Sequence, residues 1–422
     1  MCAQTDGDRP YDLILYGATG FTGQLVARYL LDHPQADSLS WAIAGRDRAK
    51  LDALRRQWGR DALPLVLADS TDTDSLRQMA AQTTALCTTV GPYARYGSDL
   101  VAACIDEGTD YCDLTGEVHW VRQMIERHHR RAVDNQVRIL HCCGFDSIPS
   151  DLGVYFLQSQ AREHLGEPVD RIRMLLWGAK GGISGGTAAS MADLVEAASR
   201  DASIRRILSD PYSLAPSGHR GGPDTGVQQW SKHEEDLDVW TAPFIMAAIN
   251  EKIVRRTNAL LDYPYGESFR YREATRVGSG VPGIFRANLM SAAVAALSAG
   301  LALGPTRALL KRFLLPESGE GPDQETIESG HFTLRFFGTR ASSSNDTPLV
   351  VEVSADADPG YGATSMMLGE TALALALDDP DDFSDPHLHD GGVLTPAAAL
   401  GDGLIDRLQE AGLRFQTLES PS

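Results

Sequence analysis

The feature that most constrains the fold is a glycine-rich run near the N-terminus, Tyr-Gly-Ala-Thr-Gly-Phe-Thr-Gly at residues 16–23. An apolar run at residues 13–16 precedes it, and residues 24–31 carry apolar side chains at helical spacing. A strand, a glycine turn and a helix in this order suit a dinucleotide pyrophosphate, because the turn allows close approach and the helix N-terminus offers N–H groups. A glycine-rich turn without a ligand is the alternative. We predict cofactor contacts from Gly17, Ala18, Thr19, Gly20, Phe21, Thr22 and Gly23.

Residues after the next two predicted strands indicate which dinucleotide binds. The second strand, residues 41–45, is followed by Arg46 and Asp47. An arginine here neutralises the 2′-phosphate of NADP, whereas an acidic residue binds the ribose 2′-hydroxyl of NAD. We predict NADP(H), recognised by Arg46; Asp47 keeps NAD as an alternative and is equally suited to capping the next helix. Asp69 ends the third strand and is predicted to meet the adenine edge, with capping of the next turn as the other interpretation.

Strand-like and helical segments alternate as far as residue 143, which predicts a Rossmann-type α/β fold with a doubly wound parallel sheet. In such sheets ligands bind beyond the carboxyl ends of the strands. The fourth strand ends at residue 90, so the loop beginning with Gly91 and Pro92 is predicted to line the nicotinamide half of the site. Polar groups follow the next strands at residues 113–117 and 144–151.

The pattern changes after about residue 155. Strand-like runs at 171–177, 268–272, 332–337 and 349–354 predict a second, α+β domain on a mainly antiparallel sheet. We expect a nucleotide-binding domain at 1–155, a substrate and dimerisation domain at 156–380, and a segment at 381–422 that returns to the first domain. A glycine turn at 181–187 before a predicted helix suits either an anionic substrate group or plain helix capping.

Charge and cysteine content exclude several classes of protein. The net charge of −19 disfavours nucleic acid and anionic membrane surfaces as partners. The six cysteines show no zinc-like spacing, and His141-Cys142-Cys143 would alternate faces on a strand, so we predict no metal site. His387 and His389 are expected in a loop. The N-terminus lacks a signal sequence, which predicts a cytoplasmic protein.

Residues 287–306 are uncharged and rich in alanine, serine and glycine. Their length reaches that of a membrane span, which needs about 20 apolar residues, but leucines are few. Three interpretations stay open: a span, a helix buried at a homodimer interface, and a surface helix that contacts lipid or a peripheral membrane. We expect a homodimer.

Taken together, these motifs resemble the saccharopine dehydrogenase-like oxidoreductases, and within them the trans-acting enoyl reductase group. The resemblance spans nearly the whole chain and is carried by residues 16–23, 44–46, 90–93, 111–117, 144–151, 184–187 and 392–396. It implies an NADP-binding domain, a central domain for substrate and dimer contacts, and a C-terminal return to the first domain. A basic cluster for a dicarboxylic amino acid is not evident, which counts against saccharopine as substrate.

We therefore expect an NADPH-dependent reductase of an enoyl, lipid-type substrate, with hydride passing to the β-carbon of the enoyl group and an acid protonating the α-carbon. Tyr93 is the first candidate for the proton donor or an oxyanion contact, followed by Asp146 and Ser147. Packing of Tyr93 beneath the cofactor and helix capping by Asp146 and Ser147 are the structural alternatives. A reductase of imines formed from an amino acid and a keto acid, and a non-catalytic NADP-binding, lipid-associated protein, are the alternative functions.

Overall fold

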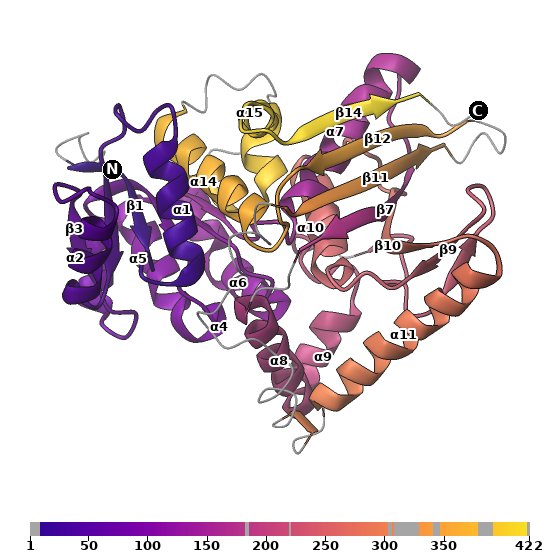
Figure 1. Ribbon diagram of the computed structural model, residues 1–422, viewed down its shortest axis with the longest axis horizontal. Coiled ribbons are helices and arrows are strands. Elements are labelled where there is room, and N and C mark those ends of the chain that lie inside the picture. The colour runs from indigo at the N-terminus through magenta and orange to yellow at the C-terminus, as the bar shows by residue number, and fades with distance from the viewer. Residues whose placement is uncertain are drawn as a thin grey trace.

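Two sheets lie side by side in the molecule, with the N-terminal one in indigo and purple on the left of Figure 1. The computed structural model describes residues 9–181, 185–218, 221–302, 306–307, 329–340, 347–378 and 391–419. The two histidines expected in a loop, His387 and His389, lie outside these ranges, as does part of the glycine turn at 181–187.

The first sheet is parallel throughout and has the strand order β13-β6-β5-β4-β1-β2-β3. Its strands are β1 (Tyr11–Tyr16), β2 (Trp41–Gly45), β3 (Leu65–Leu67), β4 (Thr83–Thr88), β5 (Asp110–Asp113), β6 (Arg138–Leu140) and β13 (Gly392–Leu394). The predicted doubly wound sheet is confirmed. Sequence periodicity located every strand except β13, which is only three residues long and comes from the far end of the chain.

Helices cover both faces of this sheet, and the side chains of β1 alternate between the two faces. Leu13 and Leu15 of β1 pack into one core cluster, and Ile14 and Tyr16 pack into the other. The first cluster includes side chains from α1 (Phe21–Asp32), α2 (Arg48–Gln57) and α14 (Gly362–Leu377), and the second from α3 (Thr73–Ala80), α5 (Ser98–Glu107) and α6 (Val118–Asp134).

The second sheet has the order β14-β12-β11-β7-β10-β9-β8, and five of its six strand pairs are antiparallel. Its strands are β7 (Arg171–Lys180), β8 (Lys232–Glu234), β9 (Val239–Ala242), β10 (Arg270–Gly278), β11 (His331–Thr339), β12 (Leu349–Ala355) and β14 (Arg414–Leu418). The parallel pair, β7 with β10, is joined through intervening helices, as parallel strands require. The prediction of a mainly antiparallel second sheet is thus confirmed.

The C-terminal segment contributes to both sheets. β13 pairs with β6 of the first sheet, and after α15 (Pro396–Glu410) β14 pairs with β12 of the second. Between the sheets, α7 (Ile148–Leu165) packs against α15 and α10 (Ala247–Leu260). A buried carboxylate holds this junction: Asp151 of α7 accepts hydrogen bonds from the Thr257 hydroxyl of α10 and from the N–H of Ala397, the latter over 2.9 Å.

Three further helices form an arm below the sheets in Figure 1. They are α8 (Gly185–Arg200), α9 (Ala202–Ser209) and α11 (Gly280–Ala302). α11 contains most of the uncharged run predicted at 287–306, and among the described helices it is the one long and apolar enough to cross a membrane. It packs against α8, β9 and β10. Only 17% of its most apolar window is buried, so it is not a core helix.

Candidate active site

A cavity of about 840 Å³ extends from the carboxyl ends of β1, β2 and β4 to the helices of the arm. The glycine turn, the ends of β2 and β4 and the loops after β5 and β6 form one part of its wall. α8, α9, α10 and α11 form the other part, which is mainly apolar. Among the described residues that line the cavity, Arg46 is the one basic side chain and Asp146 the one acidic side chain.

The glycine turn is shaped by close backbone contacts. Gly17 adopts φ = 92°, which favours glycine, and the N–H of Gly20 donates to its carbonyl over 3.0 Å. A Cβ at Gly23 would lie only 2.2 Å from the same carbonyl oxygen. Gly20 caps α1 without a side-chain hydrogen bond, so the N–H groups of the first turn remain available to an anion.

Six of the seven predicted residues of this turn line the cavity. Ala18 is the exception, because its side chain is buried in the core beneath the turn. The geometry therefore matches a pyrophosphate cradle, in which backbone groups carry the contact.

The end of β2 separates the roles of Arg46 and Asp47. Asp47 caps α2 by accepting a hydrogen bond from the N–H of Lys50 over 3.1 Å, so the capping interpretation of this residue is the one observed. Arg46 is exposed, lines the cavity and makes no hydrogen bond or ion pair within the described ranges. An arginine placed in this way suits the 2′-phosphate of NADP.

Asp69 does not line the cavity, and its carboxylate stabilises a turn. Its Oδ1 accepts hydrogen bonds from the N–H and the hydroxyl of Thr71, at 2.9 and 2.8 Å, and these bonds hold the pKa of Asp69 below its usual value. Ser70 and Thr71 line the cavity in its place. The predicted adenine contact of Asp69 is thus not visible in the wall, whereas its turn-capping role is.

The loop after β4 brings Gly91, Pro92 and Tyr93 to the cavity, as predicted. Glu117 fixes this loop by accepting hydrogen bonds from the N–H groups of Tyr93 and Ala94, at 2.8 and 3.0 Å. It also accepts one from the Ser190 hydroxyl of α8 at 3.1 Å, which links the loop to the arm. Burial raises the pKa of Glu117, although the two backbone N–H groups oppose this shift.

The phenol of Tyr93 is turned towards the sheet. Its hydroxyl donates to the carbonyl of Thr88 over 3.1 Å, and the ring stacks on Trp120 with centroids 5.6 Å apart. Burial raises the pKa of this phenol well above its ordinary value. The structure therefore favours the packing interpretation of Tyr93, with its proton committed to a backbone oxygen.

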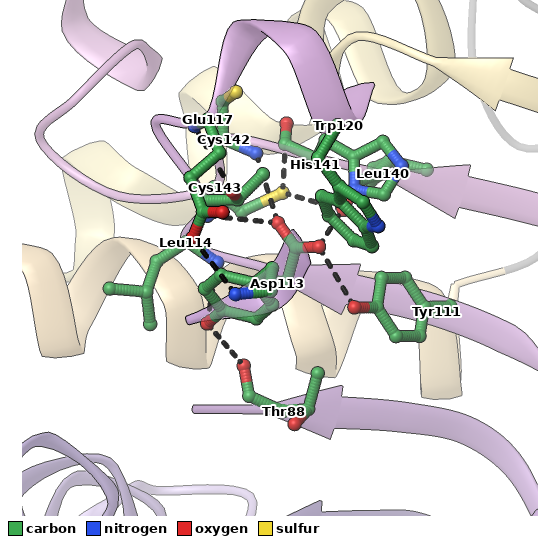
Figure 2. A network of polar contacts seen from close by, with 12 residues as sticks. Thr88, Tyr111, Asp113, Leu114, Glu117, Trp120, Leu140, His141, Cys142 and Cys143 are labelled. Carbon is green, nitrogen blue, oxygen red and sulfur yellow. Dashed lines mark hydrogen bonds and ion pairs between the residues drawn. The ribbon is translucent and has the colours of Figure 1, made fainter. Parts of the chain in front are cut away.

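Behind this loop lies a buried network centred on Asp113 (Figure 2). Its Oδ2 accepts from the Tyr111 hydroxyl over 2.8 Å and lies 2.7 Å from His141 Nδ1, while Oδ1 accepts from the N–H of Thr115 over 3.0 Å. These contacts hold the turn that carries Leu114, Thr115 and Gly116 on the cavity wall. His141 is thus a buried structural residue, and the described residues contain no cluster of three potential metal ligands.

Asp146 is the acidic group of the cavity. It lies half-buried in the loop after β6, with Oδ2 close to Gly116, and it accepts no hydrogen bond within the part of the chain that the structure describes. Burial raises its pKa to about 7. The neighbouring Ser147 is fully buried outside the wall, and its hydroxyl donates to Asn250 Oδ1 over 3.0 Å.

Sequence reasoning missed most of the apolar wall. It comes from α8, α9, α10, α11 and the segments before β8 and α10, which only tertiary packing brings together. Examples are Leu194, Leu208, Phe244, Ile249 and Val294. The uncharged run at residues 287–306, most of which lies in α11, is evident in the sequence, but nothing local predicts that one side of the helix lines a cavity.

The fold, the glycine cradle and Arg46 define a dinucleotide-dependent oxidoreductase. The model of the saccharopine dehydrogenase NADP-binding domain matches residues 13–140. Proteins named trans-acting enoyl reductase from Mycobacterium bovis and Mycobacterium ulcerans are 39% and 38% identical, each over 97% of this chain and 98% of the relative. A protein from Mycobacterium tuberculosis, to which the same name is given provisionally, is 43% identical over 97% of this chain and 98% of the relative.

The chain belongs to the saccharopine dehydrogenase-like oxidoreductases and, within them, to the trans-acting enoyl reductase group. Its cofactor is NADP(H). The fold is shared with apo saccharopine dehydrogenase (L-Glu forming) from Saccharomyces cerevisiae, with a TM-score of 0.51 and 14% identity over 97% of this chain and all of the other. The predicted family and cofactor are confirmed.

Proposed function

We propose that this protein reduces the carbon–carbon double bond of an α,β-unsaturated acyl substrate. The observation that carries the proposal is the composition of the cavity wall: among its described residues Asp146, in the loop after β6, is the one acidic side chain, and the helices of the arm supply a mainly apolar part. An apolar wall accommodates an acyl chain, and an acid with a pKa of about 7 is suited to proton transfer near neutral pH. The names of the relatives support the same substrate class.

The alternative function, reduction of an imine formed from an amino acid and a keto acid, finds less support. A dicarboxylic amino acid would need cationic side chains to hold its carboxylates. Arg46 is the one basic residue among the described residues of the wall, and it lies at the end of β2, where the adenosine ribose is expected.

The reaction adds one hydride and one proton across the double bond. NADPH, when bound, supplies the hydride for the β-carbon. Protonated Asp146 supplies the proton for the α-carbon, and the apolar side chains from the arm exclude water from the site. Gly17 and Gly23 shape the cradle for the pyrophosphate, and Glu117 fixes the loop beside the cofactor.

Steady-state turnover with Asp146→Asn tests this assignment. With NADPH and enoyl thioesters of different chain lengths, we expect kcat to fall by about 10²-fold or more, because a general acid contributes about 10²- to 10⁴-fold. In the unmodified protein activity should fall above about pH 7, where Asp146 loses its proton, and this alkaline decrease should disappear in the variant. Asp69→Asn is the matched control, because Asp69 lies outside the cavity wall.

Tyr93→Phe separates the two candidate acids. We expect it to keep kcat within about threefold, since one neutral hydrogen bond to a backbone carbonyl is lost. A loss equal to that of Asp146→Asn would return the acid role to Tyr93. NADPH oxidation that requires an amine and a keto acid together, or binding of NADPH without any turnover, would refute enoyl reduction.

A further inference from the structure

The four most exposed large apolar side chains of the described residues lie on and beside α11. Val281, Phe285 and Leu289 follow at intervals of four along the helix and are 80%, 68% and 61% exposed. Trp230, 65% exposed, precedes Ser231, whose hydroxyl donates to Asn288 Oδ1 of α11 over 2.8 Å. We call Trp230, Val281, Phe285 and Leu289 the α11 patch. Exposed large apolar side chains gathered on one helix and the segment bonded to it indicate an interaction surface.

The opposite side of α11 holds the helix against the protein. Gly283, Ala287 and Ser291 are buried, and a Cβ at Gly283 would lie 2.6 Å from the carbonyl oxygen of Gly278 at the end of β10. The helix therefore lies along the edge of the molecule, as Figure 1 shows in orange, and presents one side outwards. This arrangement fits a helix that lies in a membrane interface rather than one that crosses the bilayer.

The stretch of sequence that contains α11 differs in charge from the chain as a whole. The sequence contains no aspartate or glutamate from residue 274 to residue 316, although the net charge is −19. Arg286, in the middle of the patch, is exposed and makes no hydrogen bond or ion pair within the described residues. A basic residue flanked by phenylalanine and leucine suits a surface that offers both phosphate groups and acyl chains.

The overall negative charge of the protein does not decide whether one of its surfaces binds an anionic membrane. Charges more than a Debye length away, about 8 Å at physiological salt, are largely screened, so the side chains at the contact dominate. The net charge of −19 predicts repulsion from anionic membranes, but this expectation treats the charge as uniform, and the α11 region departs from the average.

A second copy of the chain fits this patch less well than lipid does. In a symmetric dimer the same patch faces itself, so the four apolar side chains would be covered while each Arg286 would meet a surface without acidic residues from the same stretch. A second copy would bring the exposed carboxylates of Glu235, Asp236 and Asp238 between β8 and β9 beside α11, whereas a bilayer offers phosphate groups and acyl chains at one surface.

The patch is also continuous with the cavity. Trp230 lines the cavity wall together with Val294, Ala295 and Ser298 of α11. We propose that the α11 patch docks this protein on a phospholipid bilayer containing anionic lipids, so that the α11 wall of the cavity lies against the membrane. Docking does not depend on the proposed reaction; only the idea that apolar substrate enters from the bilayer rests on it.

Vesicle flotation of the full-length protein with NADPH tests the docking. We expect flotation with vesicles of phosphatidylcholine and phosphatidylglycerol, and at least a tenfold weaker partition for Phe285→Glu/Leu289→Glu. The matched control is Val133→Glu/Leu165→Glu, which adds the same charge at exposed apolar positions on α6 and α7. Arg286→Gln should weaken binding to vesicles with phosphatidylglycerol and leave binding to pure phosphatidylcholine unchanged.

Equal flotation of the α11 variant and its control, or no flotation of the unmodified protein, would overturn the proposal. So would a dimer in light scattering that becomes monomeric in the α11 variant, since this result assigns the patch to a second copy. Turnover of a short, soluble enoyl thioester without vesicles should be the same in all variants. Loss of flotation with normal turnover therefore concerns docking, whereas absence of turnover in every variant concerns the proposed reaction.

Discussion

Replacing Gly23 by alanine should displace the glycine turn that forms the cofactor cradle, because the new side chain has no room there. The new Cβ would lie 2.2 Å from the carbonyl oxygen of Gly17, 2.8 Å from its carbonyl carbon and 2.9 Å from Thr89 Oγ1. Because real Cβ contacts essentially never fall below 3.0 Å, α1 or the turn must move by about 0.8 Å. Overpacking of this kind costs about 1–3 kcal/mol, and the upper value applies here because two of the three contacts are with rigid backbone.

The same displacement should weaken NADPH binding. The phosphate contacts depend on N–H groups at the start of α1, and one hydrogen bond to a charged group is worth about 1.5–3 kcal/mol. Losing one such bond corresponds to an affinity decrease of about 10- to 100-fold. Urea unfolding of the cofactor-free protein, followed by circular dichroism, measures the first effect, and titration with NADPH by intrinsic fluorescence measures the second.

Gly20→Ala is the matched control for this substitution. Its Cβ would lie 3.4 Å from the carbonyl oxygen of Gly17, an ordinary contact, and Gly20 has φ = −76°, which alanine adopts readily. We expect unchanged stability without cofactor, but weaker NADPH binding because Gly20 faces the cavity. Unaltered urea unfolding of Gly23→Ala would refute the close contact, and unaltered NADPH affinity of Gly20→Ala would refute the cradle.

Three further substitutions test the site and the core. Arg46→Ala should weaken NADPH binding about 10- to 100-fold with little effect on NADH, and equal losses in titrations with both cofactors would exclude Arg46 as the 2′-phosphate contact. Glu117→Gln should lower the free energy of unfolding by about 2 kcal/mol, since an amide cannot accept from both Tyr93 and Ala94; unchanged urea unfolding would contradict this. Burial raises the pKa of Glu273 from 4.5 to about 7. Glu273 therefore keeps its proton to a higher pH in the native protein than in the unfolded chain, and the free energy of unfolding should decrease as the pH rises from 4.5 to about 7. Glu273→Gln should remove roughly 3 kcal/mol of that decrease, and an unchanged pH dependence of urea unfolding would refute the shift.

The cofactor side of the site was predictable because its signals are local. A glycine at residue 17 needs φ = 92°, and a glycine at residue 23 needs room for a backbone oxygen, so the sequence spacing itself encodes the cradle. The position of Arg46 on the cavity wall was predictable because Arg46 directly follows β2, the neighbour of β1 in the sheet, and this strand end faces the cofactor in the fold class. In contrast, Asp47 and Asp69 each suited two roles in the sequence, and it is the hydrogen bonds they accept from the N–H groups of Lys50 and Thr71 that show the capping role of each.

The substrate side was less predictable because its residues are distant in sequence. α8, α10 and α11 begin at residues 185, 247 and 280, and no periodicity shows which side of each helix faces a common cavity. The direction of a side chain is also a tertiary property: Tyr93 and Asp146 both follow strand ends, yet the Tyr93 hydroxyl donates to Thr88, while Asp146 keeps an unbonded carboxyl in the cavity.

This division between the two halves has a chemical consequence. Arg46 and Asp146 both follow strands of one parallel sheet, so their separation is fixed by hydrogen-bonded strands and is insensitive to changes in the second domain. The apolar wall is carried by helices of the arm, whose contacts with the sheet loops include the Ser190–Glu117 hydrogen bond and the ion pair of Arg95 with Asp193 at 3.0 Å. Under the proposed function, changes on the arm can therefore alter the size of the acyl group that fits, while the cofactor cradle and Asp146 keep their positions.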